Sequence, residues 1–113
     1  MRLALLLFAL PSFAKVNFVR DIKPILEDHC VRCHGGERAM KSLRLDRADR
    51  AMRVITPKNP DDSTLYLACK TGFMPPGPQK LSAQQLETIR KWIQEGARWP
   101  KNVQLESRNP FLK

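Results

Sequence analysis

The segment that most constrains this chain is the run CVRCH at residues 30–34. Two thiols three positions apart, with a histidine directly after the second, form a pattern typical of covalent c-type haem attachment. In that chemistry each cysteine sulfur adds across one haem vinyl group, and the adjoining imidazole binds the iron. The pattern predicts one haem c, attached through Cys30 and Cys33, with His34 as an iron ligand.

Other interpretations of this motif are a chance pair of cysteines, half of a zinc site and a redox-active thiol pair. Zinc needs four nitrogen or sulfur ligands, and Cys69 and His29 could complete such a set, although neither belongs to a second paired cluster. A thioredoxin-like pair would need alternating strands and helices, and the chain shows no such alternation. Haem attachment is therefore favoured.

Residues 1–14 have the pattern of a secretory signal peptide. Arg2 supplies a positive charge, residues 3–10 form an unbroken apolar run, and small residues precede the expected cleavage point after Ala14. A permanent membrane helix needs about 20 apolar residues, so this run is too short. We expect export, to the periplasm or a similar compartment, with no permanent membrane span after cleavage. An N-terminal core helix or a retained anchor is the alternative.

The 113 residues carry a formal net charge of +9, and a chain of this length forms one small domain. A basic surface can serve nucleic acid, an anionic membrane or an acidic protein. Because the basic residues are spread along an exported chain, nucleic acid is the weakest of these partners. Most of the charge is expected to be solvated surface. The sharper hypothesis is docking onto redox partners with acidic surfaces.

Hydrophobic periodicity and capping residues predict four helices between residues 15 and 100. Their expected ranges are 22–30, 47–53, 64–70 and 83–95, with Asp21, Asp46, Asp62 or Ser63, and Ser82 at the respective N-caps. The last helix is the most regular, because Ser82 and Gln85 form a capping box. After Pro100 the polar tail 101–113 is expected to lie loosely on the surface.

A second chemical feature is the run MPPGP at residues 74–78. Three prolines cannot continue a helix, and they hold the preceding Met74 in a stiff, extended loop. Such stiffness suits a weak thioether–iron bond, because a mobile methionine would lose more entropy on binding. Met74 lies 40 residues after His34, which is far enough to reach the opposite face of a haem. Met74 is therefore the predicted second iron ligand.

Several other residues with ligating or aromatic side chains receive structural interpretations. His29 is assigned to structure or solvent, because His34 is the residue placed to reach iron. Met40 and Met52 are interpreted as core filler. Cys69 is expected to be a small buried residue, with an intermolecular disulfide as the minor alternative. The two tryptophans, Trp92 and Trp99, are expected to pack in the core or at a haem edge.

Seven short segments, in order along the chain, carry a resemblance to a known family. They are residues 18–26 (FVRDIKPIL), 30–35 (CVRCHG), 43–46 (LRLD), 60–65 (PDDSTL), 74–76 (MPP), 81–82 (LS) and 92–100 (WIQEGARWP). In this order they resemble the Planctomycete-type cytochrome c domain, a class-I-like monohaem c-type cytochrome. The resemblance implies an all-α fold whose N- and C-terminal helices clamp one covalent haem, with His34 as proximal and Met74 as distal ligand. Cys69 has no role in that pattern.

The expected function is that of a soluble electron carrier with no enzymatic activity. Two filled axial positions leave no room for a substrate, and His/Met ligation raises the potential relative to ligation by two imidazoles. The alternative is a haem-based ligand sensor, or a small peroxidase-like protein, in which Met74 does not bind iron and one position stays open. A purely structural or zinc-binding exported module is the third hypothesis.

Overall fold

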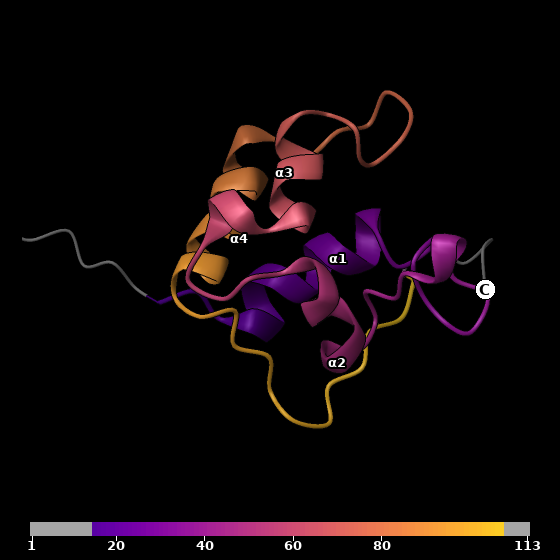
Figure 1. Cartoon of the computed structure of the whole chain (residues 1–113), viewed down its shortest axis with the longest axis horizontal. Coiled ribbons are helices and arrows are strands. Elements are labelled where there is room, and N and C mark those ends of the chain that lie inside the picture. Colours follow the sequence, from indigo (N-terminus) through magenta and orange to yellow (C-terminus); the bar gives the residue numbers. More distant parts are fainter. Residues whose placement is uncertain (1–14, 108–113) are drawn as a thin grey trace, which may run out of the picture.

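A computed structural model describes residues 15–107, so the predicted signal peptide, residues 1–14, and the end of the tail lie outside the described part (Figure 1). Every regular element within residues 15–107 is helical, which confirms the all-α prediction. The α-helices are α1 (Lys23–His29), α2 (Ala48–Ala51), α3 (Thr64–Lys70) and α4 (Ala83–Gln94). A π-helical segment (Phe18–Ile22) precedes α1, and 3₁₀-helices span Met40–Ser42, Met52–Val54 and Pro60–Asp62. None of the helices described here is long and apolar enough to cross a membrane.

Helical structure begins earlier than expected at the N-terminal end. Asn17 is the N-cap, and its side chain accepts the Arg20 N–H while its own N–H donates to the Asp21 carboxylate, each over 2.8 Å. The prediction of Asp21 as N-cap is therefore wrong. Pro24 has no N–H to bond the carbonyl four residues back. The chain instead forms a wider π turn, in which the Lys23 N–H bonds to the Phe18 carbonyl.

The prediction for α4 is confirmed to within one residue. The Ser82 hydroxyl accepts the Gln85 N–H at 3.0 Å, and the Gln85 side chain accepts the Ser82 N–H at 2.9 Å. This capping box satisfies two N–H groups that would otherwise lack a partner. Gly96 follows the helix with a φ of +112°, a conformation that favours glycine.

The predicted range of α3 is also confirmed, and Ser63 holds the N-cap position. The Ser63 hydroxyl does not cap the helix, however. It accepts the Thr56 N–H at 2.8 Å and lies 2.9 Å from the Asn59 carbonyl, to which it donates. A fully buried serine thus ties the preceding loop to the start of α3.

The predicted helix 47–53 is divided into α2 and the 3₁₀-helix Met52–Val54, and Asp46 is not its N-cap. Arg47 occupies that position without a side-chain cap bond. The Asp46 carboxylate instead accepts the Gly36 N–H at 3.1 Å and two hydrogen bonds from the Arg44 guanidinium. A carboxylate with three donors around it is not free to cap the helix that follows.

The N-terminal helical segment packs against α4 through a cluster of three aromatic rings, in agreement with the implied contact between terminal helices. The Phe18 centroid lies 5.6 Å from that of Trp92 and 4.5 Å from that of Trp99. The Trp92 indole N–H donates to the Arg98 carbonyl, and that of Trp99 to the Val103 carbonyl. Trp92 is buried in the core and Trp99 is partly buried against it, so the core alternative of the prediction holds for Trp92 and the packing against the core for Trp99.

The described part of the tail, residues 101–107, is not loose, so that expectation is wrong there. Leu105 is 2% exposed, and its N–H donates to the Asp46 carbonyl at 2.9 Å. The next N–H, of Glu106, donates to the buried Glu27 carboxylate at 3.0 Å. The segment is polar in composition, but one apolar side chain and two backbone hydrogen bonds fasten it to the domain.

Candidate functional site

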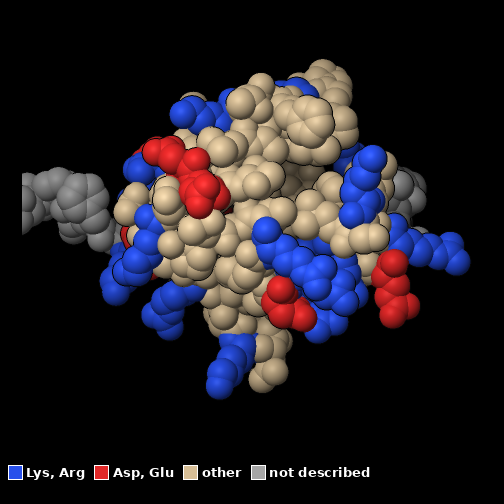
Figure 2. All heavy atoms as spheres, viewed as in Figure 1, with Lys and Arg blue, Asp and Glu red and all other residues tan. Residues whose placement is uncertain are grey.

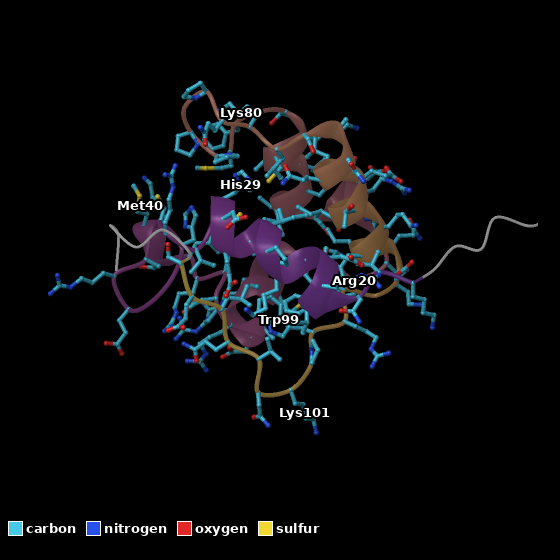
Figure 3. The ribbon with its side chains drawn as sticks, turned by 180° about the vertical axis from the view of Figure 1, so that it is seen from behind. Arg20, His29, Met40, Lys80, Trp99 and Lys101 are labelled. Atoms are coloured by element: carbon cyan, nitrogen blue, oxygen red, sulfur yellow. The ribbon has the colours of Figure 1, made fainter. Side chains whose placement is uncertain are left out.

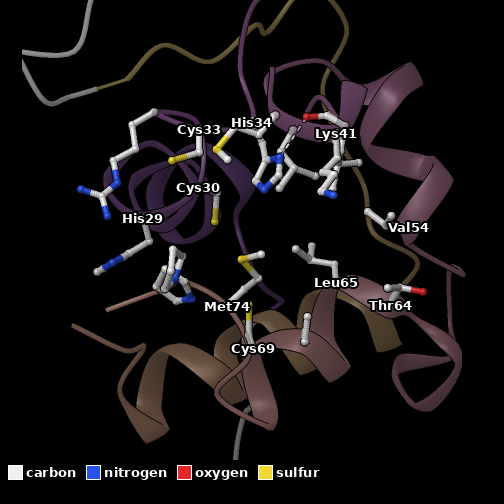
Figure 4. A pocket seen from close by; sticks show the side chains of 17 residues that line it. His29, Cys30, Cys33, His34, Lys41, Val54, Thr64, Leu65, Cys69 and Met74 are labelled. Atoms are coloured by element: carbon white, nitrogen blue, oxygen red, sulfur yellow. Dashed lines mark hydrogen bonds between the residues drawn. The ribbon is translucent and has the colours of Figure 1, made fainter. Parts of the chain in front are cut away.

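A largely apolar cavity opens on one side of the domain, between the CVRCH turn, residues 40–45, α3 and the loop that follows α3. The empty space in and immediately outside it, open solvent at the mouth included, is about 860 Å³. Figure 2 shows a hollow in the uncharged part of one face, with basic side chains beside it. The lining residues include Cys30, Cys33, His34, Leu43, Leu45, Leu65, Cys69, Met74 and Pro75 (Figure 4).

The CVRCH turn continues directly from α1. The N–H groups of Cys30 and Val31 both bond to the Leu26 carbonyl at 2.9 Å, and the N–H groups of Cys33 and His34 bond to the Cys30 carbonyl. This tight turn holds both thiols at the cavity wall, where Cys30 is buried and Cys33 half-buried. The two sulfurs are therefore presented on a rigid frame.

The His34 imidazole is oriented by its Nδ1, which lies 3.1 Å from the Leu43 carbonyl oxygen. A carbonyl can only accept, so Nδ1 carries the proton and Nε2 keeps its lone pair for a metal. The Leu45 N–H donates to the His34 carbonyl at 2.6 Å. The backbone and the ring of this residue are thus both fixed before any ligand binds, as is typical of metal-ligating histidines.

The glycine after His34 is required for space. A Cβ at Gly35 would lie 2.6 Å from both the Val31 Cγ1 and the Val31 carbonyl oxygen. The next residue, Gly36, has a φ of +71° and donates its N–H to Asp46. The first glycine thus permits a close approach within the turn, and the second permits an unusual backbone angle.

Met74 enters the cavity from the loop between α3 and α4, whereas His34 enters from the turn after α1. The Met74 N–H donates to the Ala68 carbonyl at 3.0 Å, which ties the start of the loop to α3. Pro75 is buried beside it. Figure 4 shows the Met74 side chain pointing inward, toward Cys30. The structure thus brings all four predicted site residues to one cavity.

Three residues given structural roles from the sequence also line this cavity. Met40 is 58% exposed, so its assignment as core filler is wrong. Met52 packs against the core and does not line the cavity. His29 is half-buried at the wall, and Cys69 is buried there. The burial of Cys69 is confirmed. Helical spacing on α3 indicated that Cys69 points inward. No sequence signal indicated that Met40 lies at the cavity.

Burial controls the protonation of the thiols. It raises the pKa of Cys30 to about 12, with smaller contributions from Cys69 and Cys33, and it also raises the pKa of Cys69. Both groups are neutral thiols at pH 7. A thioredoxin-like pair needs a lowered thiol pKa. The redox-pair interpretation is therefore disfavoured.

The residues of the cavity fit a c-type haem. Two thiols for covalent attachment, an imidazole with a free Nε2 and a thioether all face one apolar space. The described residues contain no cluster of three or more His, Cys, Asp or Glu side chains suited to a metal ion. The zinc interpretation, which needed His29 and Cys69 to join the motif, gains no support from this part of the chain.

An all-α fold with these groups around one cavity defines the class of c-type cytochromes. Residues 30–78 match the family model described as Planctomycete cytochrome C. This match supports a Planctomycete-type cytochrome c domain, as the sequence resemblance indicated, and such a domain implies covalent haem c. In the same comparisons no curated protein and no solved structure matches the chain.

Proposed function

We propose that this c-type cytochrome is an exported monohaem carrier of single electrons between redox partners, with its iron bound by His34 and Met74. The observation that carries the proposal is the arrival of both side chains, from different loops, at the cavity lined by Cys30 and Cys33. With haem bound, His34 and Met74 would supply both protein ligands of the iron. The arrangement therefore favours electron transfer over binding of a substrate.

Haem c, when bound, supplies a one-electron Fe(II)/Fe(III) couple. The Cys30 and Cys33 sulfurs hold the ring through thioether bonds, each formed when a thiol S–H adds across a vinyl group without net oxidation. His34 donates through Nε2, because its Nδ1 proton is held by the Leu43 carbonyl. Met74 donates through its thioether sulfur. The apolar wall excludes water and disfavours the additional charge of the oxidised site.

Spectroscopy of the purified, exported protein tests the attachment. We expect a pyridine haemochrome of c type that survives denaturation, with one haem per chain. A fully matured protein without covalent haem would overturn the proposal.

Substitution of Met74 tests the second ligand. Because His/Met ligation raises the reduction potential, Met74→Ala is expected to lower the potential and to change the visible spectrum. Met52→Ala is the matched control, since Met52 does not line the cavity. If Met74→Ala keeps the wild-type potential and spectrum, Met74 is not a ligand.

Carbon monoxide separates the carrier from the alternative. A reduced iron with both axial positions occupied resists carbon monoxide at neutral pH, whereas a sensor or a small peroxidase-like protein binds it readily. Rapid binding by the wild-type protein would favour the second function.

The proposed partners are redox proteins with acidic docking surfaces, not nucleic acids. The excess of basic over acidic residues supports an acidic partner, as do Arg32 and Lys41 at the cavity wall. Attraction between opposite charges is screened by salt, so electron transfer to an acidic partner is expected to slow as ionic strength rises. A rate independent of salt would remove this part of the proposal.

A further inference from the structure

The loop that carries Met74 has few internal restraints. Between the end of α3 and the start of α4 it contains no helix or strand, and Pro75, Pro76 and Pro78 supply no N–H donors. Residues 76–80 are exposed, while Pro75 is buried. The Met74 N–H is bonded to the Ala68 carbonyl, so the N-terminal side of Met74 is fixed. Its C-terminal side needs another anchor.

Lys80 supplies that anchor. Its ammonium nitrogen lies 2.6 Å from the carbonyl oxygen of Pro75, the residue directly after Met74. The chain returns toward this carbonyl through Gly77, whose φ is +90°, and the Lys80 N–H bonds to the Pro78 carbonyl at 3.1 Å. Hydrogen bonds from charged donors are shorter and about twice as strong as neutral ones. Figure 3 labels Lys80 on this loop.

The two anchors act on opposite sides of one residue. The Ala68 carbonyl holds the Met74 amide, and the Lys80 ammonium holds the next carbonyl along the chain. Between them, the Met74 backbone cannot move away from the cavity without breaking a hydrogen bond. The Ala68 contact involves only backbone atoms, so Lys80 is the side chain through which this restraint can be removed.

We propose that Lys80 is a positioning residue that keeps Met74 in the cavity and so keeps external ligands away from the iron. The proposal rests on the proposed function, because it assigns to Lys80 the closure of the His34/Met74 site. Without the ammonium group, the loop opens more often and the second axial position is exposed for longer. One exposed lysine thereby separates a closed electron carrier from a haem protein with an accessible iron.

The test compares Lys80→Ala with Lys101→Ala in the haem-loaded protein. Each variant removes one positive charge, and Lys101 is an exposed residue that Figure 3 places at the opposite end of the molecule from Lys80. The rate of carbon monoxide binding to the reduced protein is expected to rise about tenfold in Lys80→Ala, the lower end of what loss of a charged hydrogen bond produces. Lys101→Ala should bind at the wild-type rate.

Two further measurements distinguish positioning from a general loss of stability. Lys80→Arg keeps a charged donor and is expected to restore most of the wild-type resistance. Amide hydrogen exchange at Met74 should be faster in Lys80→Ala, while exchange in α4 stays unchanged. A Lys80→Ala protein that resists carbon monoxide as the wild type does, or that exchanges faster throughout, overturns the proposal.

The experiments distinguish a failure of the proposed His34/Met74 site from a failure of the proposed role of Lys80. If the wild-type protein itself binds carbon monoxide rapidly, the closed His34/Met74 site is wrong, and the role of Lys80 falls with it. If the wild type resists and Lys80→Ala resists equally, the site is closed but Lys80 does not hold it.

Discussion

Two regions of the molecule are built in opposite ways: the contact between the N-terminal helical segment and α4, and the cavity proposed to hold haem. Phe18, Trp92 and Trp99 fill the helix contact with their own rings, and both indole N–H groups have carbonyl partners. At the cavity, apolar side chains, thiols, an imidazole and a thioether face open space. The first region is filled by the chain's own side chains, whereas the second leaves a space that the proposed haem would fill.

The largest effect is expected when the covalent links are removed. A protein with Cys30→Ala and Cys33→Ala cannot retain haem covalently, so the cavity loses the group that would fill it. Loss of a tightly bound ligand lowers stability by about 4 kcal/mol or more. Thermal unfolding followed by circular dichroism, compared with the haem-loaded wild type, measures the loss. Equal stability would mean that the cavity does not depend on haem.

Truncation in the helix contact tests the other region. Trp92 is 2% exposed, and Trp→Ala in a core costs about 3–5 kcal/mol. Trp92→Ala is therefore expected to lower the unfolding free energy by that amount, while the folded fraction keeps the wild-type reduction potential. Trp92 does not line the cavity, so a large change in potential would show that the two regions are coupled.

The smallest of the three effects is expected at Asp46, which connects the turn after His34 to the C-terminal tail. Its carboxylate accepts from Gly36 beside the haem motif, and its carbonyl accepts from Leu105 of the tail. Asp46→Asn keeps the shape but removes the charge, at a cost of about 1.5–3 kcal/mol for hydrogen bonds to a charged group. Chemical denaturation of both proteins at pH 7 measures this difference.

The pH dependence of that difference follows from the pKa of Asp46. Burial alone would raise the pKa, but hydrogen bonds from the Arg44 guanidinium and the Gly36 amide outweigh it and hold the pKa below its usual range. A lowered pKa stabilises the fold above the unfolded value of about 3.9. The contribution disappears as pH falls through the lower, folded value. The stability gap between wild type and Asp46→Asn should therefore close in acid, and a gap that persists at low pH contradicts this assignment.

Hydrophobic spacing and capping residues predicted the helices whose bounds are set by residues close in the sequence. The ranges of α3 and α4 follow from hydrophobic spacing and, for α4, from the Ser82–Gln85 capping box. The convergence of Cys30, Cys33 and His34 follows from their spacing in one turn. Their roles in haem binding, like that of Met74, stay predictions for the experiments above.

The errors concern residues whose partners are distant or unexpected. Asp46 has the sequence context of an N-cap, yet its carboxylate is bound by Arg44 and Gly36. The tail is polar, yet Leu105 is buried against residues far earlier in the chain. The π turn before α1 arises because Pro24 cannot continue the normal bonding pattern. Each outcome depends on a contact that helical periodicity does not encode.

The turn at Gly35 has a consequence for how this site can change. A side chain at that position would collide with the Val31 backbone, which cannot move aside without opening the turn that holds both thiols. The chemistry of the motif needs only two cysteines and a histidine, but the folded turn also demands a fourth fixed position. Randomising residues 31, 32 and 35 together and selecting for red colonies should therefore return varied residues at 31 and 32 and glycine alone at 35.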